Sequence, residues 1–335
     1  MVRRGPNLRD VAARAGVSMR TVSNVVNDAP YVAAPTRARV QRAIDELGYR
    51  PNLAARQLRS GRRDVVSLVV PEVDSPYFSE LAARFVRAAE ARGWLLRIEQ
   101  TDGNPDRERQ MLEGRYGQDV DGVVFSPWAM SPQELSRSSS APPVVMLGER
   151  SALGVVDHVA VDNVAAAEAA TGHLLRRGRR RIAAIGLQPH LSNQTAVQRQ
   201  EGHRRALAAA GLPADPALEV AVQRLHRADG AEAVRRMLTP GLAVDALFCF
   251  TDQLALGAMR VLADQGLRVP DDVAVVGFDG IEDGAYSVPR LTTIAPDKDA
   301  LAARALDCLA ERMVDRTLPG RDVVVPHGLV VRESS

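Results

Sequence analysis

From Val65 onward the chain alternates short apolar runs with longer segments of amphipathic helical pattern. The first runs are VVSLVVP, WLLRIEQ, GVVFS and PVVMLG, and those after Asp162 are RIAAIGL, LEVAVQ, DALFCF and VAVVGF. Strands separated by helices form parallel sheets whose two faces the helices cover. Two successive sets of runs therefore predict an α/β body of two lobes, with a crossing between them at Val161–Asn163.

We expect residues 63–335 to form this body. Lobe one would comprise about 63–161 and 291–321, and lobe two about 162–290 and 322–335. The segment PRLTTIAPDKDALAARALDCLAERM would return the chain to lobe one, through a helix with one apolar face: Leu301, Ala305, Leu309 and Met313. Because ligands of α/β sheets bind at the carboxyl ends of strands, the cleft between the lobes is the predicted small-molecule site.

The first 50 residues carry a different pattern, of three short helices. In LRDVAARAGVSMRTVSNVVN, apolar residues recur at helical spacing on both sides of a break where Gly16 can end one helix and Ser18 can cap the next. A third helix is predicted in APTRARVQRAIDELGY, with Pro35 in its first turn and Gly48 at its end. Three short helices with a tight glycine-containing turn predict a helix-turn-helix head.

Positive charge is concentrated in this head. Residues 1–63 hold 13 arginines against four acidic residues, a net charge of +9, whereas the whole chain has a net charge of only +2. A basic head on a mildly acidic body indicates a polyanionic partner for the head, and double-stranded DNA is the prediction. Solvated surface arginine is the alternative, in a chain whose single lysine is Lys298, but it does not explain the clustering.

The second predicted helix has a polar outer edge that suits a major groove. Arginine pairs bidentately with guanine and asparagine with adenine, while hydroxyl groups bind phosphate. We therefore predict base contacts from Met19, Arg20 and Asn24, and backbone contacts from Thr21 and Ser23. An αα-hairpin used only for packing is the alternative, and it leaves this polar edge unexplained.

These stretches resemble the LacI/GalR family of bacterial transcriptional repressors. The resemblance extends from the head through VAAPTRARVQRAIDELGYRPNLAARQLRSG into the body, in SPYFSEL, VDGVVFSP, VAVDN, TDQLALGAMRVLADQGLRVPDDVAVVGFDG and PRLTTI. It implies a sequence-specific repressor that binds a near-palindromic operator as a homodimer. It also implies a core similar to periplasmic sugar-binding proteins, through which a small molecule, expected to be a saccharide, controls DNA affinity.

Residues 51–62 are predicted to form a hinge helix of about nine residues, too short to be stable alone. A generic linker is the alternative, but linkers favour glycine, serine and proline. The resemblance implies that two hinge helices lie in the minor groove, where Leu58 wedges between base pairs. Arg56 and Arg59 would then contact phosphates.

The candidate cleft residues follow the ends of predicted strands. An aromatic platform, a guanidinium and carboxylates suit a polyhydroxylated ligand. Asp252 could equally be a helix cap, and the two aromatic residues of lobe one could be core. The resemblance implies that Arg199 and Asp279 anchor the effector. The full set is Asp74, Tyr77, Phe78, Ser126, Trp128, Asn193, Thr195, Arg199, Asp252 and Asp279.

Several positions depart from the family pattern. Asn193 and Leu225–His226 replace an arginine and an aromatic residue of purine-binding members, which argues against a purine effector. Gly148 stands where many members carry a ligand-binding aspartate, so that Glu149 substitutes or the pocket is more open. Ala34 replaces a serine cap of the third helix, a loss of about 1 kcal/mol.

No pattern in the chain indicates catalysis, a cofactor or a metal. The P-loop, GxSxG and HExxH motifs are absent, the six histidines are scattered, and Cys249 and Cys308 form no CxxC. An α/β enzyme is therefore disfavoured.

The N-terminal MVRRGPNLRD lacks the apolar stretch of a secretory signal, and no apolar run of 18 residues exists. A cytoplasmic protein is expected, without a membrane span, rather than a binding protein for sugar capture. Because no leucine-heptad tail precedes Ser335, a dimer is favoured over a tetramer.

Overall fold

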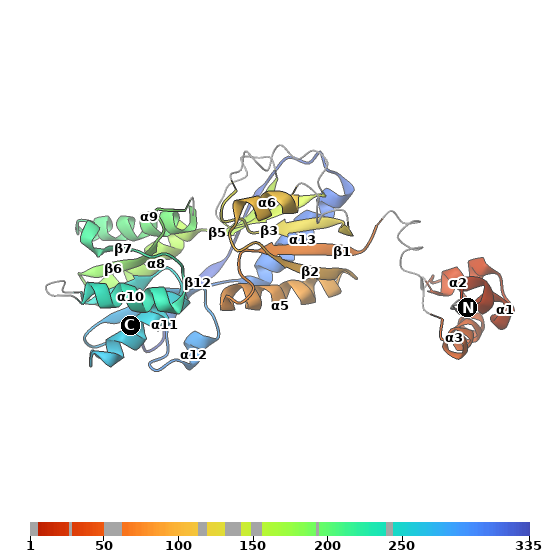
Figure 1. Ribbon diagram of the computed structural model, residues 1–335, viewed down its shortest axis with the longest axis horizontal. Helices are drawn as coiled ribbons and strands as arrows, with labels where there is room; N and C mark the ends of the chain where they lie inside the picture. The colour runs from red at the N-terminus through yellow and green to blue at the C-terminus, as the bar shows by residue number, and fades with distance from the viewer. Residues whose placement is uncertain are drawn as a thin grey trace. The chain divides into compact units, whose positions relative to one another are not determined.

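The computed structural model describes residues 6–26, 29–49, 62–112, 119–130, 142–148, 156–191, 194–238 and 244–335. The chain divides into two compact units, Met1–Arg63 and Asp64–Ser335. The first contains helices and the second two parallel-dominated sheets with helices around them (Figure 1). The predicted α/β class is therefore confirmed. None of the helices in the described ranges is long and apolar enough to cross a membrane.

The N-terminal unit is a three-helix head formed by α1 (Leu8–Ala15), α2 (Met19–Val26) and α3 (Ala34–Leu47). Its core contains Val11, Val22 and Val40, each fully buried. Gly16 ends α1 in the left-handed conformation, and the Ser18 hydroxyl accepts a hydrogen bond from the Thr21 amide at 3.1 Å. Both roles were predicted, and together they fix the turn between the first two helices.

The third helix starts without a side-chain cap. Its N-cap residue is Ala33, one position before the predicted Ala34, and no side chain bonds the free amides there. Pro35 lies in the first turn and Gly48 ends the helix in the left-handed conformation, as predicted.

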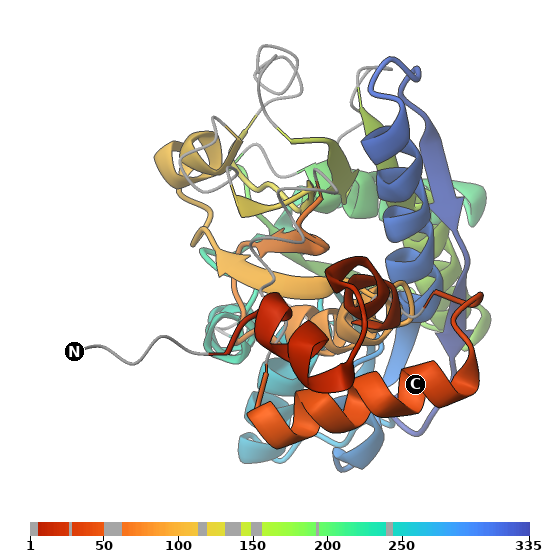
Figure 2. The same cartoon turned by 90° about the vertical axis from the view of Figure 1, so that its right-hand side faces the viewer.

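Lobe one of the second unit is a parallel sheet of six strands in the order β11-β5-β4-β3-β1-β2. Its strands are β1 (Val65–Val70), β2 (Leu95–Gln100), β3 (Gly122–Phe125), β4 (Val144–Leu147), β5 (Asp157–Val161) and β11 (Asp322–Val325). Helices α5 (Pro76–Glu90) and α13 (Lys298–Val314) pack on one face, where α13 crosses β3, β4 and β5 (Figure 2). Helix α6 (Pro105–Leu112) lies on the other face.

The alternation along β1 explains this layering. Val66, Leu68 and Val70 belong to the apolar cluster that contains residues of α5 and α13, whereas Val69 packs with Met111 of α6. Because successive strand residues point to opposite faces, a strand with apolar residues on both faces must be covered on both sides.

Lobe two is a second six-stranded sheet, in the order β12-β10-β9-β8-β6-β7. Its strands are β6 (Ile182–Leu187), β7 (Glu219–Ala221), β8 (Ala246–Cys249), β9 (Ala274–Phe278), β10 (Thr292–Pro296) and β12 (His327–Val330), and only β12 is antiparallel to its neighbour. Paired helices cover both faces of this sheet (Figure 1). The pairs are α8 (Asn163–Arg176) with α9 (Gln194–Ala209), and α10 (Arg227–Met237) with α11 (Asp252–Asp264). Short elements η2 (Pro216–Leu218) and α12 (Asp283–Tyr286) complete the lobe.

The predicted lobe boundaries are wrong for two strands. Strand β10, expected in lobe one, pairs with β9 in lobe two, whereas β11, expected in lobe two, pairs with β5 in lobe one. The chain therefore crosses between the lobes near residues 161–163, 296–298 and 325–327.

Side-chain contacts explain both placements. The buried Thr293 of β10 donates a hydrogen bond to Asp252 of lobe two at 2.6 Å. The buried Asp157, at the start of β5, accepts from Arg312 of α13 at 2.7 Å and from Arg321, just before β11, at 2.8 Å. Burial alone would raise the pKa of Asp157, but the two arginines outweigh it and the pKa is lowered.

Two glycines allow α10 and α11 to pack closely. A Cβ atom added at Gly257 would lie 1.8 Å from the Arg227 carbonyl oxygen, and one at Gly230 would lie 2.1 Å from that of Leu254. Each helix thus presents a glycine to the backbone of the other, and a larger residue at either position forces the helices apart.

We therefore expect Gly257→Ala to lower the free energy of unfolding by about 1–3 kcal/mol, the usual cost of overpacking. Gly328→Ala is the matched control, because no atom lies within 4 Å of a Cβ added there. Urea denaturation followed by circular dichroism measures both. Equal stability of the two variants would contradict the close packing of α10 and α11.

Candidate functional site

The head presents the outer edge of α2 to solvent. Val22 and Val25 are buried, whereas Met19 is 48% exposed and Arg20 is also exposed. Asn24 is half-buried. The orientation expected from the helical pattern is thus present, and the contacts of these side chains with bases remain predictions.

The two hydroxyl residues on this edge are only partly exposed. The Thr21 hydroxyl already forms a 2.9 Å hydrogen bond with that of Ser18. Ser23 also has an interaction within the protein. Their proposed phosphate contacts therefore remain predictions. Arg56, Leu58, Arg59, Asn193 and Glu149 lie outside the described residues.

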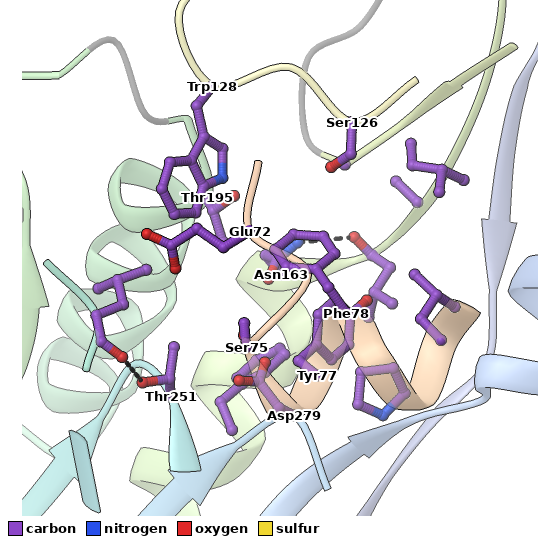
Figure 3. Close-up of a pocket in the computed structure, with 18 of the residues that line it drawn as sticks. Glu72, Ser75, Tyr77, Phe78, Ser126, Trp128, Asn163, Thr195, Thr251 and Asp279 are labelled. Atoms are coloured by element: carbon purple, nitrogen blue, oxygen red, sulfur yellow. Dashed lines mark hydrogen bonds between the residues drawn. The ribbon is translucent and has the colours of Figure 1, made fainter. Parts of the chain in front are cut away.

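In the second unit, one pocket lies between the two lobes. Seven predicted residues line it, and Figure 3 shows the two aromatic residues of α5 on one side and Asp279 near the loops of lobe two. The seven are Tyr77, Phe78, Ser126, Trp128, Thr195, Arg199 and Asp279. They follow strands of both sheets, so the expectation that strand ends converge on the cleft is met.

Arg199 is held in the pocket by contacts on several sides. Its Nε atom donates to Asn163 Oδ1 at 2.8 Å, and its Nη1 atom donates to the Phe250 carbonyl. The guanidinium carbon lies 3.5 Å from the centroid of the Phe278 ring. The carboxylate of Asp279 is 3.9 Å from Nη1, and both side chains are almost fully buried. This network fixes the guanidinium plane, so that a ligand meets a preorganised donor.

Asp252 is neither a ligand contact nor a helix cap, which corrects both predictions for it. It is fully buried and does not line the pocket, and the N-cap of α11 is Thr251. Its carboxylate accepts from the Ile281 amide at 2.9 Å and from the Thr293 hydroxyl at 2.6 Å. Burial, followed by the nearby charge of Asp279, raises the pKa of Asp252 well above its usual range. Asp252 therefore supports the turn that carries Asp279.

Asp74 does not line the pocket either, because its side chain is exposed in the loop before α5. Glu72, two residues earlier, lines the pocket where we expected Asp74. The Glu72 carboxylate lies 2.7 Å from Nε2 of His226, which belongs to lobe two. This polar contact spans the cleft.

A second polar contact joins the lobes next to Asp279. Glu80 of α5 accepts from Lys298 at 2.6 Å and from the Glu282 amide at 2.8 Å. Lys298, at the start of α13, also donates to the Gly280 carbonyl at 3.0 Å. A pair of opposite charges from lobe one thus holds the backbone turn that follows Asp279 in lobe two.

Sequence reasoning missed several pocket residues that also follow strands. Two signals were available: Glu72 comes directly after the first apolar run, and Asn163 ends the recognised VDN crossing. Gln253 gave no such signal, because it lies within a helical pattern and not directly after an apolar run. The missed residues with polar side chains are Glu72, Ser75, Asn163, Gln194, His226, Thr251 and Gln253. Gly148, at the position of the family's aspartate, also lines the pocket.

Comparisons with known proteins agree with this arrangement. Residues 7–52 match the family described as "Bacterial regulatory proteins, lacI family", and residues 171–335 match a "Periplasmic binding protein-like domain". The transcriptional regulator CelR of Thermobifida fusca is 36% identical over 99% of both chains, and catabolite control protein A of Priestia megaterium is 31% identical over 97% of this chain and 98% of its own.

This chain belongs to the lacI family of bacterial regulatory proteins.

Solved structures support the same assignment. A CelR–cellobiose complex matches 98% of this chain and 100% of its own, with 31% identity and a TM-score of 0.73. The lac repressor dimer, bound to operator and the anti-inducer ONPF, matches 99% of both chains, with 27% identity and a TM-score of 0.84. The predicted family is therefore confirmed, and this lacI-family chain is a DNA-binding transcriptional regulator and not an enzyme. The described residues contain no group of three or more potential metal ligands.

The two aspartates of lobe two give a direct test of their different roles. We expect Asp252→Ala to lower the free energy of unfolding by about 1–3 kcal/mol for each donor left buried without a partner. Asp279→Asn is expected to cost less than Asp252→Ala, because the amide keeps the size of the side chain and removes only a charge 3.9 Å from Nη1 of Arg199. Chemical denaturation of both variants provides the comparison, and equal losses would show that Asp252 does not support the turn.

Proposed function

We propose that this lacI-family regulator is a homodimeric repressor that binds a near-palindromic operator and responds to a saccharide in the cleft. In this proposal residues 1–50 read DNA, residues 51–62 form the hinge, and residues 63–335 form the effector-binding and dimerisation core. The observation that carries this proposal is that one chain contains both an exposed polar edge on α2 and a preorganised polar pocket between two lobes.

The DNA-reading role is assigned to the exposed edge of α2. Arg20 and Asn24 have the donor and acceptor groups for guanine and adenine in the major groove, and Met19 offers apolar contact beside them. Thr21 and Ser23 would position the head on phosphates, and Arg56, Leu58 and Arg59 would act in the minor groove.

Two features support a homodimer. The solved lac repressor relative is a dimer bound to operator. In this chain, large apolar side chains are exposed on both lobes. Leu95 and Ile98 lie on the edge strand β2 of lobe one, and Val288, 96% exposed, follows α12 of lobe two. Such residues are candidates for burial by a second copy, and two-fold symmetry would then impose a near-palindromic operator.

The pocket supports a saccharide effector. Trp128 offers a flat apolar face, whereas Arg199, Asp279 and Glu72 offer charged partners for hydroxyl groups. The CelR relative is solved as a complex with cellobiose. A ligand of this type would contact both lobes at once.

Effector control would operate through the contacts that join the lobes. A ligand that competes with the Glu72–His226 pair, or that pulls on Asp279 beside the Glu80–Lys298 pair, binds the two lobe arrangements with different affinity. Only such a difference can shift an equilibrium, and typical couplings amount to about 1–3 kcal/mol.

The DNA-reading role is tested with fragments selected by the full-length protein from a random duplex library. We expect Arg20→Ala to cost about 1–3 kcal/mol of binding free energy and to relax selection at one base of each half-site. Arg42→Ala, which removes an exposed arginine of α3, is the control and should weaken all fragments equally. Fluorescence anisotropy at two salt concentrations measures both. Retained base selection in Arg20→Ala would overturn the assignment.

The effector role is tested by a thermal-shift screen of mono- and oligosaccharides, including cellobiose, on the full-length protein. A sugar that raises the melting temperature is expected to change affinity for the selected operator by about 5–150-fold. A sugar that binds the protein but leaves operator affinity unchanged would refute the coupling.

A further inference from the structure

One carboxylate of lobe one is buried beneath the pocket wall. Glu108 of α6 is 0% exposed, and its side chain accepts three backbone hydrogen bonds. The amide of Trp128 donates to Oε1 at 2.8 Å, and those of Ala129 and Met130 donate to Oε2 at 2.9 and 2.8 Å. Three consecutive amides thus converge on one side chain.

This arrangement requires a carboxylate. A buried charge is costly unless it is hydrogen-bonded, and the three amides are the donors that compensate for it here. A glutamine has one acceptor oxygen, and its NH₂ group would face a backbone N–H. Glu108→Gln therefore keeps the size of the side chain but removes at least one of the three bonds.

The indole of Trp128 is also held from a second direction. A Cβ atom added at Gly103 would lie 2.9 Å from Cε3 of Trp128, so the glycine leaves space for the ring. Gly103 comes just before α6, where Asn104 caps the first turn through the Asp106 amide at 2.9 Å. Glu108 of α6 thus bonds the Trp128 backbone, and Gly103, just before α6, lies against the Trp128 ring.

Trp128 has a particular place in the pocket. Lobe two presents Leu225 and His226 toward the ligand space, and Tyr77 and Phe78 meet each other edge to face, with centroids 5.2 Å apart. Trp128 carries the largest ring that lines the pocket, and it stands on lobe one, near Glu72 in Figure 3. A flat, partly apolar ring of a ligand can stack on it.

We propose that Glu108 is a positioning residue that fixes Trp128 as the stacking wall for a pyranose ring. The proposal rests on the effector role proposed above for the pocket. Glu108 does not touch the ligand. It acts through the backbone of residues 128–130, and its loss leaves the indole free to turn away from the pocket.

The chain permits a spectroscopic test without ligand, because its only tryptophans are Trp94 and Trp128. In a Trp94→Phe background all tryptophan fluorescence comes from Trp128. Adding Glu108→Gln is expected to shift the emission to longer wavelength and to raise acrylamide quenching about two-fold. Asp121→Asn is the matched control. It removes another lobe-one carboxylate that accepts a backbone amide, that of Asp64 at 2.6 Å, and it should leave the Trp128 signal unchanged.

The same proteins are then titrated with cellobiose, or with whichever sugar of the screen stabilises the Trp94→Phe protein. Affinity is expected to fall about ten-fold or more in Glu108→Gln and to be retained in Asp121→Asn. If Glu108→Gln does not fold, Gly103→Ala displaces the indole while the carboxylate is kept, and the same changes are expected.

Two results overturn the positioning role: an unchanged Trp128 signal in the variants, or a changed signal with unchanged sugar affinity. If no sugar binds the parent protein, the saccharide effector is refuted instead. The ligand-free fluorescence then still decides whether Glu108 positions Trp128.

Discussion

The carboxyl ends of parallel strands from two separate sheets face one cleft, and the candidate effector site depends on this constraint. A single sheet would place Trp128 and Arg199 on unrelated surfaces, but here the chain crosses between the lobes three times and brings them to one pocket. Within lobe two the anchor is rigid, because Arg199 is bonded to Asn163 and to the Phe250 backbone. Lobe one completes the site through a wall that Glu108 supports.

In the proposed effector control, ligand anchoring and lobe movement depend on different contacts. The Arg199 network is built from helices α8 and α9 and the ends of β8 and β9, so that a change in lobe arrangement would leave it intact. In the proposed control the contacts that span the lobes would change, such as Glu72–His226 and the bonds of Glu80 and Lys298 to the turn after Asp279. In that proposal these contacts differ between two lobe arrangements, because an effector acts only through its differential affinity for the two.

Much of the fold and part of the site could be predicted from local patterns. The helix-turn-helix head, the alternating strands and helices, and the pocket positions of Trp128, Arg199 and Asp279 all follow from spacing, caps and strand ends, or from family resemblance. The errors have a common cause. Asp74 and Asp252 also follow strands, but whether such a side chain reaches the cleft depends on loop geometry and on buried partners such as Thr293, which lie far away in sequence.

The sequence alone therefore determined the elements, the family and the polar edge of α2, because helical and strand periodicity and capping are local properties. Tertiary structure decided which sheets contain β10 and β11. Thr293 of β10 bonds Asp252, which is 41 residues away, and the residues before β11 bond Asp157, which is more than 150 residues away. It also decided that the buried Asp252 bonds the turn that carries Asp279, and that Glu72 contacts His226 across the cleft. Buried hydrogen bonds between distant segments leave no periodic signal in a single sequence.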